Sequence, residues 1–154
     1  MTRKTSLIIG AITVILIGFL RDYLFYNINW IYLTLVNGRM NAARDEFHFL
    51  LEWTPHQINI LKFVLTGVFI LLFFLTTFIT LRNAFKNKKN NRIIIATFLI
   101  PGLIALLLAA VGKLSGFYEE LYGAIHALTT FIQSFIPIIV LGLVFSFLPA
   151  EKSQ

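Results

Sequence analysis

The chain has 154 residues, of which 58% are hydrophobic and only 13% are charged, and its mean hydropathy is +0.82. Soluble domains carry about a quarter charged residues, so this composition excludes a soluble globular protein and indicates a membrane protein. The net charge of +6 comes from basic residues beside apolar runs, which argues against a nucleic-acid partner, and the absence of cysteine excludes disulfides, thiolate metal sites and cysteine nucleophiles.

Four segments are apolar enough and long enough to cross a bilayer, which takes about 20 residues. The first, about Ser6 to Tyr26, is expected to be an uncleaved signal anchor, because no small-residue cleavage site follows it. The others are expected at about Ile58 to Leu81, Ile93 to Gly112 and Leu121 to Leu148. With short connections, the sequence predicts one all-α membrane domain over residues 1–154, an antiparallel four-transmembrane-helix bundle.

The connection Asn27 to Gln57 is predicted to add an amphipathic helix over about Arg39 to Trp53 on the outer surface. Apolar residues fall on one face of this helix and polar residues on the other: Met40, Ala43, Phe47, Leu50 and Leu51 against Asn41, Arg44, Asp45, His48 and Glu52. The apolar segment Ile28 to Val36 is too short to span and is expected at the interface. Thr54-Pro55 is expected to end the helix.

The orientation follows from the loop Arg82 to Arg92, which carries five cations and no acid. Lys and Arg beside a span resist translocation, so this loop is predicted to be cytoplasmic. The inner side then holds eight basic residues and one acid, for +7, and the outer side five basic and six acidic residues, for −1, which together give the +6 of the chain. Both termini are therefore predicted in the cytoplasm of a bacterium, with the protein in the inner membrane, and all seven Tyr and Trp residues outside.

Arg21 and Asp22 place two ionisable groups at the outer end of the first span. Charges within a span are costly and commonly mark a ligand or partner site; alternatively, these two lie at headgroup depth and merely end the hydrocarbon segment. Consecutive helical residues point about 100° apart, so the two are not expected to pair with each other. Glu119, Glu120 or His126 are the candidate partners at that depth.

Gln133, Ser134 and Pro137 lie in the middle of the fourth span. A proline removes a backbone hydrogen bond and frees the carbonyl of Gln133, and Pro101-Gly102 is expected to interrupt the third span similarly. Such interruptions can mark a substrate site, as in transporters with discontinuous helices. Such interruptions are also ordinary in structural bundles. This interpretation is favoured, because no charged residue lies at mid-depth.

A metal site is a weaker candidate. Arg44, His48 and Glu52 step by four along one helix face, and His48 and Glu52 together with His126 could ligate a metal ion. A solvated polar face explains the same spacing and is favoured, since no HExxH-like signature is present. Haem is not expected, because the other histidines lie outside the predicted spans, and no cofactor is predicted. His126 is explained as well by a hydrogen bond to a neighbouring carboxylate.

Two segments carry a resemblance: GFLRDYLFYNIN (Gly18 to Asn29) and IQSFIPIIVLGLVF (Ile132 to Phe145). They resemble a group of small uncharacterised bacterial four-span proteins, with an Arg at the outer end of the first span, an aromatic stretch after it and a Gln-Ser-x-x-Pro step in the last span. The first segment is also similar to exosortase-associated small membrane proteins. The resemblance implies a four-span fold and points to Arg21, Gln133, Ser134 and Pro137, but it implies no activity.

No catalytic constellation is found in the sequence, so an enzyme is not favoured. The leading hypothesis is a non-catalytic accessory protein of the lipid bilayer that binds a larger membrane or envelope assembly, hence a membrane-protein partner, through its outer face; a homo-oligomer stays open. The alternative is a small carrier or lipid-binding protein with an outward-facing cavity between the third and fourth spans, near Arg21 and His126. The third is a metal or acid–base enzyme on the outer face.

Candidate ligand or partner residues are Arg21, Asp22, Glu119, Glu120, His126, Gln133 and Ser134.

Overall fold

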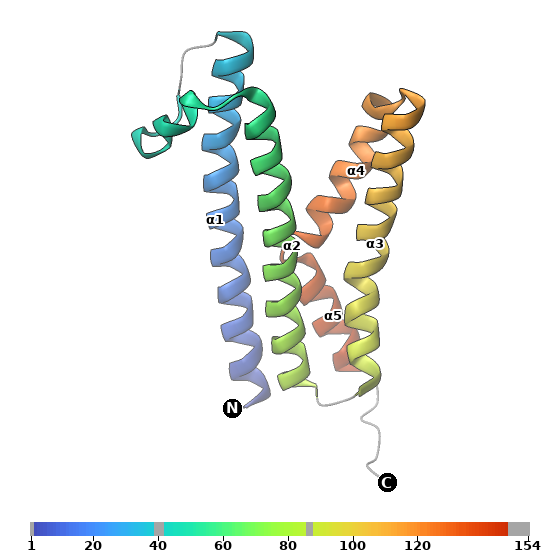
Figure 1. Ribbon diagram of the computed structural model, residues 1–154. Coiled ribbons are helices and arrows are strands. Elements are labelled where there is room, and N and C mark those ends of the chain that lie inside the picture. The colour runs from blue at the N-terminus through green and yellow to red at the C-terminus, as the bar shows by residue number, and fades with distance from the viewer. Residues whose placement is uncertain (1, 39–41, 86–87, 148–154) are drawn as a thin grey trace.

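The computed structural model describes residues 2–38, 42–85 and 88–147, and their regular structure is entirely helical. The helices are α1 (Arg3–Asn37), the short 3-10 helix η1 (Asp45–Glu52), α2 (Pro55–Ala84), α3 (Lys88–Ser115), α4 (Tyr118–Ile132) and α5 (Ile136–Phe147). Figure 1 shows α1 and α2 side by side as one hairpin and α3 and α4 as a second. Helix α5 fills the half of the molecule nearer the N-terminus, between α2 and α3.

Helices α1, α2 and α3 are each long and apolar enough to cross a membrane, and α4 with α5 would make a fourth, broken span, bent by 59°. The all-helical class with three to four candidate spans is thus confirmed. The fourth span predicted at about Leu121 to Leu148 is not one continuous helix, because the chain leaves the helix after Ile132 and resumes it at Ile136. Leu148 itself lies outside the described residues.

Local hydrogen bonding explains the break between α4 and α5. The Ser134 hydroxyl donates to the Phe131 carbonyl (2.8 Å) and accepts from the Ile136 amide (3.2 Å), so it satisfies backbone groups at both helix ends. Pro137 falls in the first turn of α5, where a missing N–H leaves no helical bond unmade. By contrast, α3 continues through Pro101 from Lys88 to Ser115, so that proline does not end the helix.

Helix α1 is longer than the sequence suggests. It runs on to Asn37 instead of ending near Tyr26, so Ile28 to Val36 is not a separate segment. No helix-breaking residue intervenes before Gly38, which adopts a left-handed φ of 63° and donates its N–H to the Thr34 carbonyl at 3.0 Å. The helix therefore extends well beyond the depth of a single span.

The connection between α1 and α2 folds as a 3-10 helix over Asp45–Glu52 rather than as an α-helix over about residues 39–53. Residues 39–41, with Met40 and Asn41 of the predicted faces, lie outside the described part of the chain. The predicted sidedness of the rest is confirmed: Ala43 and Leu50 are buried and Phe47 and Leu51 half-buried, whereas Arg44, Asp45, His48 and Glu52 are exposed.

Two sets of polar contacts hold the connection between α1 and α2 in place. Asn27 is buried in α1, where its side-chain amide donates to the Tyr23 carbonyl (2.8 Å) and its oxygen accepts from the Arg44 amide (2.9 Å). Thr54 and Gln57 form a reciprocal capping box that starts α2, with Pro55 as the first helical residue. Thr54-Pro55 thus marks the beginning of the next helix, three residues before the predicted span at Ile58.

The core has two apolar clusters, one on each side of mid-length. The larger joins α1, α2, α3, α5 and Ile132 at the end of α4 in the half nearer the N-terminus, and the smaller joins α1, η1 and α2 in the opposite half. Gly10 lets α1 approach Thr80 of α2 so closely that a Cβ at position 10 would overlap the threonine side chain.

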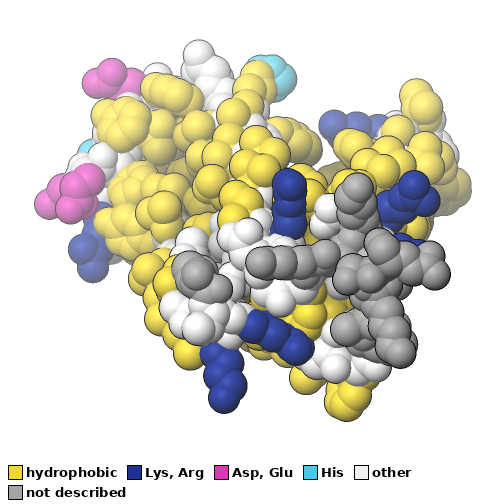
Figure 2. Space-filling model, turned by 90° about the horizontal axis from the view of Figure 1, so that it is seen from below, with side chains coloured by type: hydrophobic (Ala, Val, Ile, Leu, Met, Phe, Trp, Pro, Cys, Tyr) yellow, Lys and Arg dark blue, Asp and Glu magenta, His cyan; other side chains and the backbone are white. Residues whose placement is uncertain are grey.

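Seen from the N-terminal end, the molecule presents Lys and Arg side chains, and Asp and Glu show only at one edge (Figure 2).

Candidate ligand-binding cavity

A cavity of about 700 Å³ lies between the α1–α2 hairpin and the α3–α4 hairpin. Its lining holds three cations, Arg21 from α1, Lys62 from α2 and Lys113 from the end of α3, together with two histidines, His56 and His126. Aromatic and apolar side chains complete it, and no Asp or Glu of the described residues lines it. A cavity with three basic groups and no acid is a site suited to an anion.

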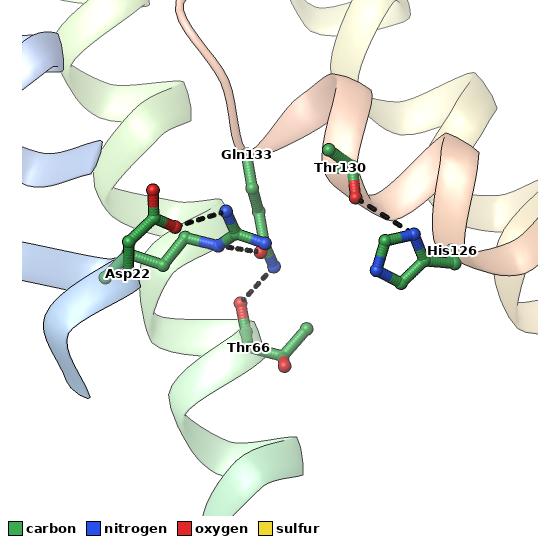
Figure 3. Close-up of polar contacts among 6 residues, drawn as sticks. Asp22, Thr66, His126, Thr130 and Gln133 are labelled. Atoms are coloured by element: carbon green, nitrogen blue, oxygen red, sulfur yellow. Dashed lines mark hydrogen bonds and ion pairs between the residues drawn. The ribbon is translucent and has the colours of Figure 1, made fainter. Parts of the chain in front are cut away.

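Gln133 forms the floor of the cavity by joining three parts of the fold. Arg21 Nε donates to Gln133 Oε1 (2.8 Å), and Gln133 Nε2 donates to the Thr66 carbonyl (3.1 Å), as Figure 3 shows. Gln133 is buried and caps the end of α4, so the break between α4 and α5 is what turns its side chain to both hairpin helices. The amide thereby orients the Arg21 guanidinium at the bottom of the cavity.

Arg21 also pairs with its neighbour, contrary to the expectation from helical geometry. Its Nη1 lies 3.0 Å from Asp22 Oδ1. The Cβ atoms point apart, but the long arginine side chain reaches across the gap to the carboxylate. The Arg21 side chain keeps 22% of its surface exposed and that of Asp22 keeps 72%, so Asp22 is at the edge of the site rather than inside it. The predicted partners Glu119, Glu120 and His126 form no hydrogen bond or ion pair with Arg21 in the described part of the chain.

Each cavity cation lies over an aromatic ring. Lys62 Nζ is 4.8 Å from the centroid of the Tyr32 ring, Lys113 Nζ is 5.5 Å from that of Phe63, and the Arg21 guanidinium carbon is 5.7 Å from that of Phe25. Neither lysine forms an ion pair with any carboxylate among the described residues. A cation–ring contact contributes about 0.5–2 kcal/mol and leaves the positive charge in place. The cavity therefore keeps a positive potential.

The sequence did not indicate Lys62 and Lys113 as site residues, because their charges entered only the prediction of topology. One signal in the sequence could have identified Lys62: it interrupts an otherwise apolar span near the same outer end as Arg21. Lys113 offered no comparable signal, since a basic residue in the last turn of a helix is explained by the helix dipole alone.

The remaining predicted residues are placed as follows. His126 lines the cavity from α4, with its Nδ1 3.5 Å from the Thr130 hydroxyl and its ring 5.8 Å from that of Tyr122, rather than beside a carboxylate (Figure 3). Glu119 and Glu120 are exposed in the first turn of α4, where acids suit the helix dipole. Ser134 belongs to the α4–α5 break and does not line the cavity.

The predicted metal group does not form in the described part of the chain, where no three His, Asp or Glu residues could hold an ion. His48 lies on η1 with its Nε2 3.7 Å from Asp45 Oδ1, an i,i+3 pair. The i,i+4 ladder of Arg44, His48 and Glu52 required an α-helix; three residues per turn place i+3, not i+4, above each other.

Comparison with known protein families, with curated proteins and with solved structures finds no match for this chain. The resemblance to small four-span proteins stays a prediction.

Proposed function

We propose that the protein is a multi-pass protein of a bacterial inner membrane that binds a membrane amphiphile in the cavity between its two hairpins. The observation that carries the proposal is that Arg21 and His126, from helices far apart in the sequence, line one open cavity of about 700 Å³. A solid apolar core at that depth would have argued against the carrier or lipid-binding alternative. The cavity differs in position from the expected one, since it lies between the α1–α2 hairpin and the α3–α4 hairpin rather than between the third and fourth spans.

The depth of the cavity supports a headgroup site. Arg21 is 18 residues from the start of α1 at Arg3, which at 1.5 Å per residue is about 27 Å along the helix. Because a hydrocarbon core is about 30 Å thick, Arg21 comes near its outer boundary when the N-terminal end lies at the inner one. Polar lining residues such as Asn29 and His56 continue outward from there. An amphiphile would place its headgroup among these groups and its chain against the apolar helices.

The proposed orientation has both termini in the cytoplasm. It is supported by the basic loop Arg82 to Arg92 and by the Lys and Arg side chains on the N-terminal end of the molecule (Figure 2). In this orientation the cavity opens toward the outer leaflet, and the α4–α5 pair forms the fourth span of an antiparallel bundle.

The test measures the amount of lipid that stays bound when the protein is extracted from its own membrane. Ile125→Trp introduces a large ring into the cavity lining, whereas Leu107→Trp adds the same ring on an exposed apolar face of α3. We expect native mass spectrometry to detect bound amphiphile on the wild type and on Leu107→Trp, and at least about tenfold less on Ile125→Trp, a loss equivalent to about 1.4 kcal/mol. Equal occupancy in all three proteins would contradict binding in the cavity.

A second candidate, docking onto a larger membrane assembly, is favoured by the aromatic surface of the outer layer. Phe49 and Trp53 lie edge to face, 6.5 Å between ring centroids, and stay 59% and 37% exposed. Exposed aromatic residues of this kind are enriched at the centres of protein interfaces. Under mild extraction, a partner should be retained by the wild type and by the neighbouring variant His48→Ala, and lost with Phe49→Ala. Recovery of the wild type alone would argue against docking.

A further inference from the structure

We propose that the headgroup bound in this cavity is a phosphate monoester, held by Arg21, Lys62 and Lys113. The inference rests on the proposed function, because it specifies which amphiphile the cavity takes. It goes beyond it by assigning the ligand a charge and a chemical class.

The charge balance of the lining favours a phosphate over a carboxylate. Arg21, Lys62 and Lys113 contribute +3, and the Asp22 carboxylate at the edge, 3.0 Å from Arg21, subtracts one, which leaves +2. A phosphate monoester carries about −1.5 to −2 at neutral pH, which matches this excess. A carboxylate, with a single negative charge, would leave one cation without a counter-charge in a cavity near the hydrocarbon boundary.

The donors match the acceptors of a phosphate as well. Arg21 has five N–H donors, of which one is used by Gln133 and one by Asp22, so three are left for a ligand. Gln133 fixes the guanidinium through Nε, and this leaves the terminal nitrogens for the bidentate contact that arginine makes with phosphate oxygens. Lys62 and Lys113 each bring an ammonium group whose only contact given by the structure is with a ring.

The same lining disfavours a cationic or zwitterionic headgroup. Recognition of a quaternary ammonium needs open aromatic faces or a carboxylate. Here the rings of Phe25, Tyr32 and Phe63 already face a cation of the protein, and those of Tyr118 and Tyr122 are tilted against each other, 6.2 Å between centroids. No acid of the described residues lines the cavity.

The phosphate is expected on a lipid rather than free in solution. Ile60 and Phe63 line the cavity and are 49% and 65% exposed, so exposed apolar surface lies beside the cations. A free anion would have no use for this surface, whereas an acyl or prenyl chain would cover it.

The experiment compares three amphiphiles that share one chain and differ in headgroup: hexadecyl phosphate, hexadecanoate and hexadecanol. Full-length protein in a non-ionic maltoside detergent is titrated with each, and the bound fraction is read by native mass spectrometry. We expect hexadecyl phosphate to bind at least about tenfold more tightly than either of the others, since charge-assisted bonds to its oxygens add to chain burial. Lys62→Gln and Lys113→Gln should each weaken the phosphate about five- to tenfold and leave hexadecanol unchanged.

The matched control is Lys4→Gln, which removes the same charge from an exposed position outside the cavity and should leave all three affinities unchanged. Equal binding of phosphate and carboxylate, or an equal loss with Lys4→Gln, would overturn the phosphate assignment while amphiphile binding stands. Binding of none of the three would overturn the proposed function too. Displacement of hexadecyl phosphate by inorganic phosphate at a similar concentration would overturn the lipid source.

Discussion

Replacing Gln133 with leucine should free the Arg21 side chain in the cavity and weaken the contact between the two hairpins. The change removes a hydrogen bond from the charged Arg21 guanidinium, worth about 1.5–3 kcal/mol, and a neutral one to the Thr66 carbonyl, worth about 0.5–1.5 kcal/mol. Hydrogen bonds measured within membranes fall at the low end, about 0.6 kcal/mol on average. We therefore take the lower ends and expect the free energy of unfolding to fall by about 2 kcal/mol.

The assay is equilibrium unfolding in mixed dodecyl sulfate and maltoside micelles, followed by circular dichroism. Gln133→Glu is the comparison variant: it keeps an acceptor for Arg21, now with a negative charge that strengthens this bond, and it cannot donate to the Thr66 carbonyl. It should lose less than half as much stability as Gln133→Leu. A double-mutant cycle with Arg21→Met then isolates the pair, with an expected coupling of about 1 kcal/mol or more. Strict additivity of Arg21→Met and Gln133→Leu would refute the role of Gln133 as the link.

Two further predictions concern the packing of the first hairpin and the orientation. Gly10→Val should destabilise the protein by about 1–3 kcal/mol, because a side chain there would overlap Thr80, whereas Gly18→Val, with open space around it, should change little in the same unfolding assay; equal losses would contradict the close approach of α1 to α2. Since the chain contains no cysteine, single-cysteine variants report topology directly, and a membrane-impermeant maleimide on intact cells should label Glu119→Cys and leave Asn83→Cys unlabelled. Labelling of Asn83→Cys would reverse the proposed orientation.

Local pattern in the sequence was sufficient for much of the helical layout. The apolar runs located three helices and most of a fourth, since a membrane span must satisfy its backbone within one helix. Pattern also identified which face of the outer connection is buried, because Ala43 and Leu50 recur at a helical interval. It did not distinguish an α-helix from a 3-10 helix there. Because a 3-10 helix has three residues per turn, Arg44, His48 and Glu52 do not lie on one face as predicted.

Helix ends were the least predictable feature. The same proline signal appears at Pro101, where α3 continues, and at Pro137, where the chain breaks. The difference lies in the neighbourhood, because Ser134 can satisfy the backbone on both sides of the second position. The proline alone therefore does not predict whether the helix breaks or continues; the hydrogen bonds that neighbouring side chains offer to the backbone do.

The hydropathy pattern alone indicates an all-helical membrane protein, and the sequence singles out Arg21, His126 and Gln133 as unusual residues within or beside its spans. It does not reveal that these three residues line one cavity, or that Lys62 and Lys113 line it with them. Hydrophobic periodicity defines which face of a helix avoids water, but in a membrane nearly all faces are apolar, so it does not say which helix packs against which. That depends on contacts between distant segments: close packing of α1 on α2 and of α3 on α4 leaves a space between the two hairpins, and the break at Gln133 turns a polar side chain toward that space.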